Sequence, residues 1–181
     1  WGCVFCAIAA ICIFLSSNYD REKRRYLILM ESFASMLLLM DAMTHIFSGY
    51  PGVLGSVMVR ISSFLVFLLS DVVLLCFHIY VCVYLFSKKE RRTLKRVKAG
   101  YVIAAAGAVF VVISQFTHWY YYIDVDNYYH RAPLYIMSIL LPTAGMFIDL
   151  TLLLQYKKRV SRKLLFSMLS CIVLPAVAAA V

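Results

Sequence analysis

The sequence predicts an all-α fold, a polytopic transmembrane helix bundle. Hydrophobic residues make up 64% of the 181 residues and charged residues only 15%, and the mean hydropathy is +0.84. Soluble domains average about 45–50% apolar and about 25% charged residues, so one core of this size cannot bury the excess. Apolar runs long enough to cross a hydrocarbon layer of about 30 Å recur along the chain. None of them alternates as a strand would, which favours helices over a β-barrel.

Six apolar runs are the expected helices of a single domain that covers residues 1–181. They lie at about 1–16, 26–47, 61–86, 99–117, 134–155 and 164–181. No initiator Met precedes the first run, and the last run stops within apolar sequence. We therefore expect a piece of a longer protein in which the first and last helices are truncated.

Turn residues and prolines separate and shape these helices. Pro51 and Gly52 mark the turn before the third helix. Pro133 takes the first position of the fifth helix, where its missing N–H has no cost. Pro142 and Pro175 fall inside the fifth and sixth helices and should kink them. Such kinks line binding sites in some transporters, although most are ordinary bends.

The basic residues predict the orientation of the bundle. Sixteen of the 18 Lys and Arg residues lie in the alternate connections 17–25, 87–98 and 156–163. By the positive-inside rule these connections are cytoplasmic, and the N-terminal end lies outside the cell membrane. The net charge of +9 is therefore a topology signal rather than a nucleic-acid patch. Six helices from an outside start end outside, so we expect a seventh helix after residue 181.

A row of small residues predicts a close helix contact. Gly100, Ala104 and Ala108 recur every four residues along the fourth helix. Small residues at this spacing let two helices approach closely. A neighbour within the same chain is favoured, and a second protomer is the alternative.

Ionisable residues inside the apolar runs are the first candidates for a site. An Asp at the centre of a transmembrane helix costs about 2.5–3.5 kcal/mol to insert, and such residues usually face partners inside the bundle. Counting residues along each helix places Asp41 and His45 in the outer third and Asp71 toward the middle, and we call these three the outer group; Glu31, His78 and Asp149 fall in the inner third and form the inner group. Asp41 and His45 share a helix face, so we expect both to point into the bundle and to bond to other helices.

Three roles remain open for these polar residues. Interhelical hydrogen bonds are the simplest, at about 0.6 kcal/mol each. A pocket that senses a ligand or a proton is the second, because imidazole titrates near neutral pH. A metal or hydrolase site is the third, but no H-E-x-x-H spacing is present. We expect no catalytic residue, no metal and no cofactor in this segment.

The outer segment THWYYYIDVDNYYHRAPLY, at 117–135, is the most unusual stretch. One Trp and six Tyr residues alternate in it with charged residues. Amphipathic rings favour the membrane interface, so an aromatic belt is the simplest interpretation, and a small-molecule site is the alternative. The signal-sensing candidates from this segment are Trp119, Tyr121, Asp124, Asp126 and His130. The motif DVDN lacks the Gly and Glu of a calcium-binding EF-hand.

Three stretches carry a resemblance to a known family. They are SGYPGVLGSVMVRISSFLVFLLSD at 48–71, WYYYIDVDNYYHRAPLYIMSILLP at 119–142 and QYKKRVSRKLLFSMLSCIVLPAVAAAV at 155–181. They resemble the N-terminal multi-pass membrane sensor module of signalling proteins from anaerobic Gram-positive bacteria. In that family the module precedes a cytoplasmic GGDEF diguanylate cyclase or a histidine kinase. The resemblance implies a downstream output domain and, by analogy, a homodimer; it assigns no role to any residue.

These observations predict a membrane sensory module for signal transduction. It would relay an extracellular or intramembrane signal, carried by an unknown small molecule, to the cytoplasmic output domain. A diguanylate cyclase is the favoured output and a histidine kinase is next. A ligand or proton bound near the outer group and residues 117–131 would favour one of two helix arrangements. The lipid bilayer is the other expected partner, and nucleic acid is not. The alternative is a fragment of a small-solute transporter or permease, which needs polar residues throughout the membrane depth.

Overall fold

Helices form most of the chain, as the sequence predicts. The computed structural model describes residues 2–15, 20–162 and 164–170. The helices are α1 (Gly2–Leu15), α2 (Arg21–Phe47), α3 (Gly52–Leu85), α4 (Lys88–Thr93), α5 (Lys95–Thr117), α6 (Tyr135–Gln155) and the 3-10 helix η1 (Lys157–Arg159). The short strands β1 (Tyr121–Ile123) and β2 (Tyr129–Arg131) form an antiparallel hairpin between α5 and α6. The all-α fold class is confirmed.

Four helices, α2, α3, α5 and α6, are long and apolar enough to cross a membrane. The chain is therefore a helical membrane protein. α1 has 14 residues and rises only about 21 Å, less than the hydrocarbon layer of about 30 Å. In the sixth predicted run, residues 164–170 are helical, and the rest, with Pro175, lies outside the described residues. The predicted count of six spanning helices is not confirmed.

Three helices begin earlier than the apolar runs indicate, and the smallest difference is in α5, which starts at Lys95 rather than at residue 99. α2 starts at Arg21 rather than at residue 26, because Arg, Lys and Glu are good helix formers. α3 starts at Gly52 rather than at residue 61. Its 34 residues rise about 51 Å, so α3 extends well beyond the hydrocarbon layer. The start of α3 contacts the hairpin, since the Asn127 side chain donates to the carbonyl of Gly52 at 3.4 Å and to that of Tyr50, just before the helix, at 2.9 Å.

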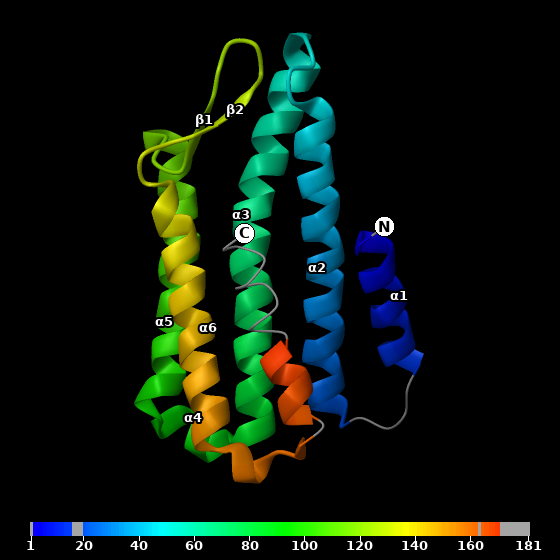
Figure 1. Cartoon of the computed structure of the whole chain (residues 1–181), viewed down its shortest axis with the longest axis vertical. Helices are drawn as coiled ribbons and strands as arrows, with labels where there is room; N and C mark the ends of the chain where they lie inside the picture. The colour runs from blue at the N-terminus through cyan, green and yellow to red at the C-terminus, as the bar shows by residue number, and fades with distance from the viewer. Residues whose placement is uncertain (1, 16–19, 163, 171–181) are drawn as a thin grey trace.

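α3 is the central helix of the bundle. α2 runs along one side of it and α5 and α6 pack on the other, while α1 lies outside α2 (Figure 1). α3 carries more of the buried residues than any other helix, whereas α2 has none. Contacts between α3, α5 and α6 therefore form the core of the protein, and α2 is a peripheral helix.

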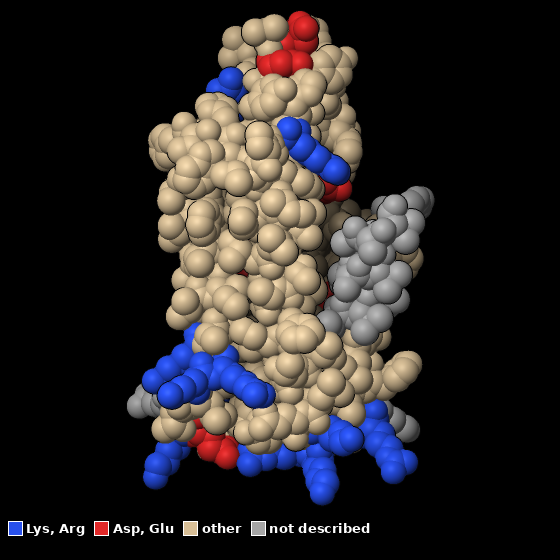
Figure 2. All heavy atoms as spheres, turned by 60° about the vertical axis from the view of Figure 1, so that its left-hand side comes forward, with Lys and Arg blue, Asp and Glu red and all other residues tan. Residues whose placement is uncertain are grey.

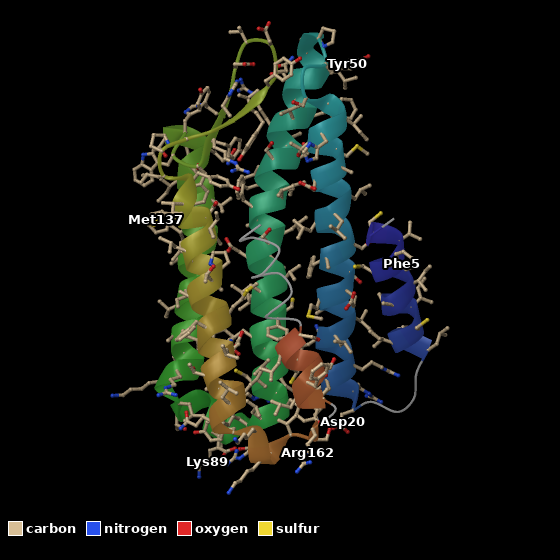
Figure 3. All side chains as sticks on the ribbon, in the orientation of Figure 1. Phe5, Asp20, Tyr50, Lys89, Met137 and Arg162 are labelled. Atoms are coloured by element: carbon tan, nitrogen blue, oxygen red, sulfur yellow. The ribbon has the colours of Figure 1, made fainter. Side chains whose placement is uncertain are left out.

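Charge divides the bundle into two ends. Figure 2 shows Lys and Arg gathered around one end, with a broad band of uncharged side chains above it. We call this the basic end; the described parts of the connections 17–25, 87–98 and 156–163 lie there, and Figure 3 labels Asp20, Lys89 and Arg162 in it. We call the opposite end the hairpin end; it holds residues 118–134 and the turn at Tyr50 (Figure 3).

The basic end is closed by a tightly packed apolar core. Val81, Cys82, Leu85, Val97, Leu152 and Leu153 are each at most 3% exposed. The α4 turn caps this core, because Ser87 and Glu90 form a capping box. Arg159 donates to Glu90 at 3.1 Å and to the Leu85 carbonyl at 3.0 Å. The hydrogen bond from the Ser87 N–H, together with Arg159, lowers the pKa of Glu90.

The small-residue row of α5 packs against α3 of the same chain. Its buried members are Gly100, Ala104 and Gly107, so the predicted third member, Ala108, is wrong. Burial along α5 alternates between steps of three and four residues, because two packed helices repeat their contact every 3.5 residues. Gly107 therefore faces α3, and Ala108 is turned aside.

Candidate functional site

Two neighbouring hollows lie under the hairpin, between the halves of the helices at the hairpin end. We call the first the Asp71 cavity; it has a volume of about 220 Å³ and is lined by α3, α5, α6 and Tyr120. Met137, labelled on α6 in Figure 3, lines it and marks its level in the bundle. We call the second the Asp41 hollow; it has about 210 Å³ and is lined by α2, α3, β2 and Tyr135. Val66, Phe67 and Tyr135 line both and separate them.

Asp71 is a buried carboxylate that borders the first cavity. Its side chain projects from α3 toward α5, and the residue is only 7% exposed. A Cβ at Gly107 would lie 2.8 Å from both carboxylate oxygens, so glycine makes the room that Asp71 occupies. No residue that the structure describes gives this carboxylate a hydrogen bond or an ion pair. Asp71 therefore reaches the cavity as a buried polar group without a protein partner.

Tyr120 brings a second unpaired group to the Asp71 cavity. Its backbone N–H donates to the buried Ser114 hydroxyl at 2.9 Å, which fixes the chain where α5 ends. Its own hydroxyl has no hydrogen-bond partner in the described part of the chain, although the residue is only 1% exposed. Burial raises the pKa of Tyr120, and the charge of nearby Asp71 adds to the effect. The cavity thus has a phenol and a carboxylate close together.

The two serine hydroxyls of this cavity are satisfied by local contacts. The Ser70 hydroxyl donates to the Val66 carbonyl at 2.8 Å, and the Ser138 hydroxyl donates to the Tyr135 carbonyl at 2.7 Å. Pro142 has no N–H to bond to the Ser138 carbonyl four residues before it, and both residues line the cavity. The sequence prediction of a proline inside this helix is confirmed.

At the Asp41 hollow, the positions of the Asp41 and His45 side chains differ from the sequence prediction. Their side chains are 55% and 80% exposed, and Asp41 Oδ1 lies 4.0 Å from His45 Nε2. The prediction that both face the interior and bond to other helices is wrong, because α2 is a peripheral helix with no buried residue. They line an open hollow instead, together with Arg131 and Ser63. The Ser63 hydroxyl is buried and has no partner among the described residues.

The candidates from the outer segment stabilise the hairpin instead of lining either hollow. Asp124 Oδ1 accepts from the N–H groups of Tyr128, at 2.8 Å, and Asp126, at 3.1 Å, while Oδ2 lies 2.8 Å from His130 Nε2. The hydrogen bond with His130 lowers the pKa of Asp124, and the Tyr128 N–H adds to the effect. Tyr121 stacks on Phe67 with ring centroids 5.4 Å apart.

Trp119 and Asp126 also lie outside both hollows. Trp119 packs on Phe110 with ring centroids 6.4 Å apart, and Asp126 is exposed near the tip of the hairpin. The residues that do line the hollows there are Tyr120, Tyr129, Arg131 and Tyr135. Alternation could have identified two of them, since Tyr129 and Arg131 are two apart on one strand and share a face.

At the basic end, His78 and Asp149 form a fully buried pair. His78 Nδ1 lies 2.6 Å from Asp149 Oδ1, and Nε2 donates to the Val97 carbonyl at 3.0 Å. Because Nε2 must carry a hydrogen, the Nδ1–Oδ1 bond holds either the second proton of an imidazolium or the proton of a neutral carboxyl. The Tyr101 ring meets the imidazole edge-on at 5.1 Å, and Gly100 gives the ring its space.

Glu31 is separate from this pair. It lies beside the Cys6 thiol of α1, on the far side of α2 from the core. The predicted inner group therefore divides into a helix-to-helix pair in the core and a carboxylate on the peripheral helix.

The inner pair has the residue types of a Cys–His–Asp triad but not its function. Cys82 Sγ lies 3.6 Å from His78 Nε2. Nε2 already carries the hydrogen that it donates to Val97, so it cannot accept the thiol proton, as a general base must. Cys82 is also inaccessible to any substrate.

In residues 2–15, 20–162 and 164–170, no group of three His, Cys, Asp or Glu side chains is placed to hold a metal ion.

We compared the chain with known proteins. No protein-family model, curated protein or solved structure matches it. The functional argument therefore depends on the contacts described above. The arrangement offers a cavity for a small molecule at the hairpin end and a closed core at the basic end.

Proposed function

We propose that this chain is a membrane sensory module that receives a small molecule at the hairpin end and relays the signal to a cytoplasmic output domain. One observation carries the proposal: the buried Asp71 carboxylate borders a cavity and has no partner among the described residues. Buried polar groups without partners are costly, and native proteins keep few of them. A ligand that pairs with Asp71 would remove this cost.

The contact between α3 and α5 supplies a route for the signal. Asp71 packs on Gly107, and the His78 ring packs on Gly100. The two contacts are seven residues apart on both helices, so they lie on the same interface. A ligand that shifts α5 against α3 at Gly107 biases the spacing at Gly100 as well. The ligand moves this equilibrium only by its difference in affinity for the two arrangements.

The basic residues support the orientation of this proposal. By the positive-inside rule, the basic end faces the cytoplasm and the cavity opens toward the outer half of the cell membrane. Basic side chains at that end would lie against anionic lipid. The resemblance to bacterial sensor modules supports a downstream GGDEF diguanylate cyclase as the first choice of output, a histidine kinase as the second, and a homodimer as the assembly.

The alternative, a transporter or permease fragment, has less support. A carrier needs a polar path through the whole depth of the membrane. Below the Asp71 cavity, the core around Val81, Leu85 and Leu153 is apolar and closed. The polar pair that the described residues form there, His78 and Asp149, is fully buried.

The test compares two Asp variants of the full-length protein in cells. Asp71→Asn removes the charge at the cavity, and Asp126→Asn removes a charge at the exposed hairpin tip as the matched control. We expect Asp71→Asn to change the activity of the output domain by about fivefold or more, the lower limit of typical allosteric coupling, with an unchanged protein level. The control should match the wild type. Equal activity in all three proteins would overturn the proposal, and solute flux through proteoliposomes would establish transport.

A further inference from the structure

We infer that the Asp71 cavity binds a small organic cation, an ammonium group whose charge pairs with the Asp71 carboxylate. This inference rests on the proposed function, because it names the class of molecule that the module receives. The ligand is small because the cavity has about 220 Å³, less than the 300–1,000 Å³ or so of sites for drug-sized molecules.

The charge of the cavity selects a cation. The carboxylate is buried, and no basic side chain in the described part of the chain pairs with it. Carboxylates inside membrane proteins almost always pair with another group. An anionic ligand would be repelled by Asp71, and a neutral apolar ligand would leave the carboxylate unpaired.

Arg131 lines the neighbouring Asp41 hollow and already contacts an aromatic ring there. It lines the Asp41 hollow and not the Asp71 cavity. Its guanidinium lies 4.7 Å from the centroid of the Tyr135 ring, in a cation–π contact. Tyr135 therefore stands between the two charges, and the ligand has to bring its own cation.

Aromatic rings complete the recognition of an ammonium group. Phe67, Tyr120 and Tyr135 all line the cavity. The Phe67 centroid lies 5.8 Å from that of Tyr120 and 6.2 Å from that of Tyr135, so the three rings form one wall. Aromatic faces attract cations, and most strongly at desolvated sites.

The test is binding of simple amines to the full-length protein in lipid nanodiscs. Ethanolammonium and benzylammonium are the probes, and ethylene glycol and benzyl alcohol are their neutral counterparts. Isothermal titration measures affinity for the wild type, Asp71→Asn and the control Asp126→Asn. We expect at least one ammonium probe to bind, its neutral counterpart not to bind, and Asp71→Asn to weaken binding about 10- to 100-fold, the effect of losing a charged hydrogen bond.

The lipid distinguishes a free amine from a lipid headgroup as the source of the ammonium. Nanodiscs of phosphatidylglycerol contain no ammonium group, whereas nanodiscs of phosphatidylethanolamine present one on every lipid. If the probes bind equally in both, the ligand is a free amine. If phosphatidylethanolamine prevents their binding, the headgroup occupies the cavity. Either result supports the ammonium site.

Two results would overturn the inference. One is that neither ammonium probe binds more tightly than its neutral counterpart, and the other is that Asp71→Asn binds as tightly as the wild type. If Asp71→Asn does not fold, Tyr120→Phe and Gly107→Ala replace it, and both should weaken binding because they line the same cavity. Amine binding that leaves the output unchanged overturns the sensory function alone. An output that depends on Asp71 without amine binding overturns the ammonium ligand alone.

Discussion

Asp149 and Asp71 are both buried carboxylates, but the protein surrounds them differently. Asp149 Oδ1 lies 2.6 Å from His78, whose other ring nitrogen donates to a backbone carbonyl at 3.0 Å. The Asp71 carboxylate borders a cavity and receives no hydrogen bond from any described residue. In both places a glycine of α5 makes room for an α3 side chain, Gly100 for His78 and Gly107 for Asp71.

The comparison shows that a buried charge alone does not mark a functional site in a membrane bundle. The same device, a glycine opposite a polar side chain, holds a hydrogen-bonded pair at the basic end and a carboxylate beside a cavity at the hairpin end. Asp149 Oδ1 bonds to His78, although Oδ2 has no partner among the described residues, whereas Asp71 borders the cavity that, in the proposed function, receives the ligand.

The largest expected effect is the loss of one partner from the closed pair. His78→Leu leaves Asp149 buried and unpaired, so it should lower the free energy of unfolding by about 3–5 kcal/mol. Denaturant unfolding in detergent micelles measures this loss. The double variant His78→Leu/Asp149→Leu is the control and should recover much of the stability, because no buried charge remains. Equal losses in the single and double variants would contradict this account of the pair.

The second prediction compares the two glycines of α5. In Gly100→Ala the new methyl group overlaps the His78 ring, which cannot move away because both of its nitrogens are hydrogen-bonded. We expect the free energy of unfolding to fall by about 1–3 kcal/mol. In Gly107→Ala the methyl group comes within 2.8 Å of the Asp71 oxygens. That carboxylate can turn into the cavity, and the higher helix propensity of Ala offsets the contact by about 1 kcal/mol. We therefore expect a smaller loss in Gly107→Ala than in Gly100→Ala. Thermal unfolding of both variants in micelles measures the two losses of stability. Equal losses would contradict the comparison between the two glycines.

The third prediction concerns stability at the unpaired carboxylate. Asp71→Asn removes a buried charge that has no protein partner, so the free energy of unfolding should stay within about 1 kcal/mol of the wild type or rise. The matched variant Asp149→Asn weakens the short hydrogen bond with His78 and should lose about 1.5–3 kcal/mol. Denaturant unfolding of both variants measures the difference. A large loss in Asp71→Asn would mean that Asp71 supports the fold, as Asp149 does.

The smallest effect is expected outside the membrane, in the pH dependence of the hairpin. The His130 contact and the backbone N–H groups lower the pKa of Asp124. The stabilisation by this carboxylate is therefore complete above its usual pKa of about 3.9 and is lost as the pH falls through the lowered value. The NMR shift of the Tyr128 amide, which donates to Asp124, should follow this titration. In Asp124→Asn the shift should be independent of pH, and a titration that persists there would have another origin.

The helical class and most helix boundaries could be predicted from apolar runs, because a bilayer fixes the length of a spanning segment. α4 and the hairpin could not. α4 depends on the capping box between Ser87 and Glu90. Because the residues around it are charged, the sequence predicted a connection there and not a helix. The hairpin depends on contacts far apart in sequence, such as that of Asn127 with Tyr50.

The candidate site could be predicted in part. Depth along each helix indicated Asp71 and the level of His78 and Asp149, because rise per residue is fixed. The partners of these residues depend on how the helices pack against one another. The spacing of apolar residues along the sequence does not determine that packing. Asp41 and His45 show the limit of prediction from spacing. Their four-residue spacing placed them on one face of α2, but only the packing of the helices shows that this face is exposed.

The central position of α3 has a consequence for how the protein enters the membrane. The α5 and α6 partners of the buried Asp71 and His78 come from chain made later: Gly107 packs on Asp71, Val97 follows His78 by 19 residues and Asp149 follows it by 71. At about 5–20 residues per second, a ribosome takes roughly 4–14 s to make that interval. During this time α3 carries Asp71 and His78 without these partners, and its own 34 residues, with a window of mean hydropathy 2.4, and its packing along the earlier α2 hold it in the membrane. The length of α3 and its contact with α2 thus let synthesis proceed before the core exists.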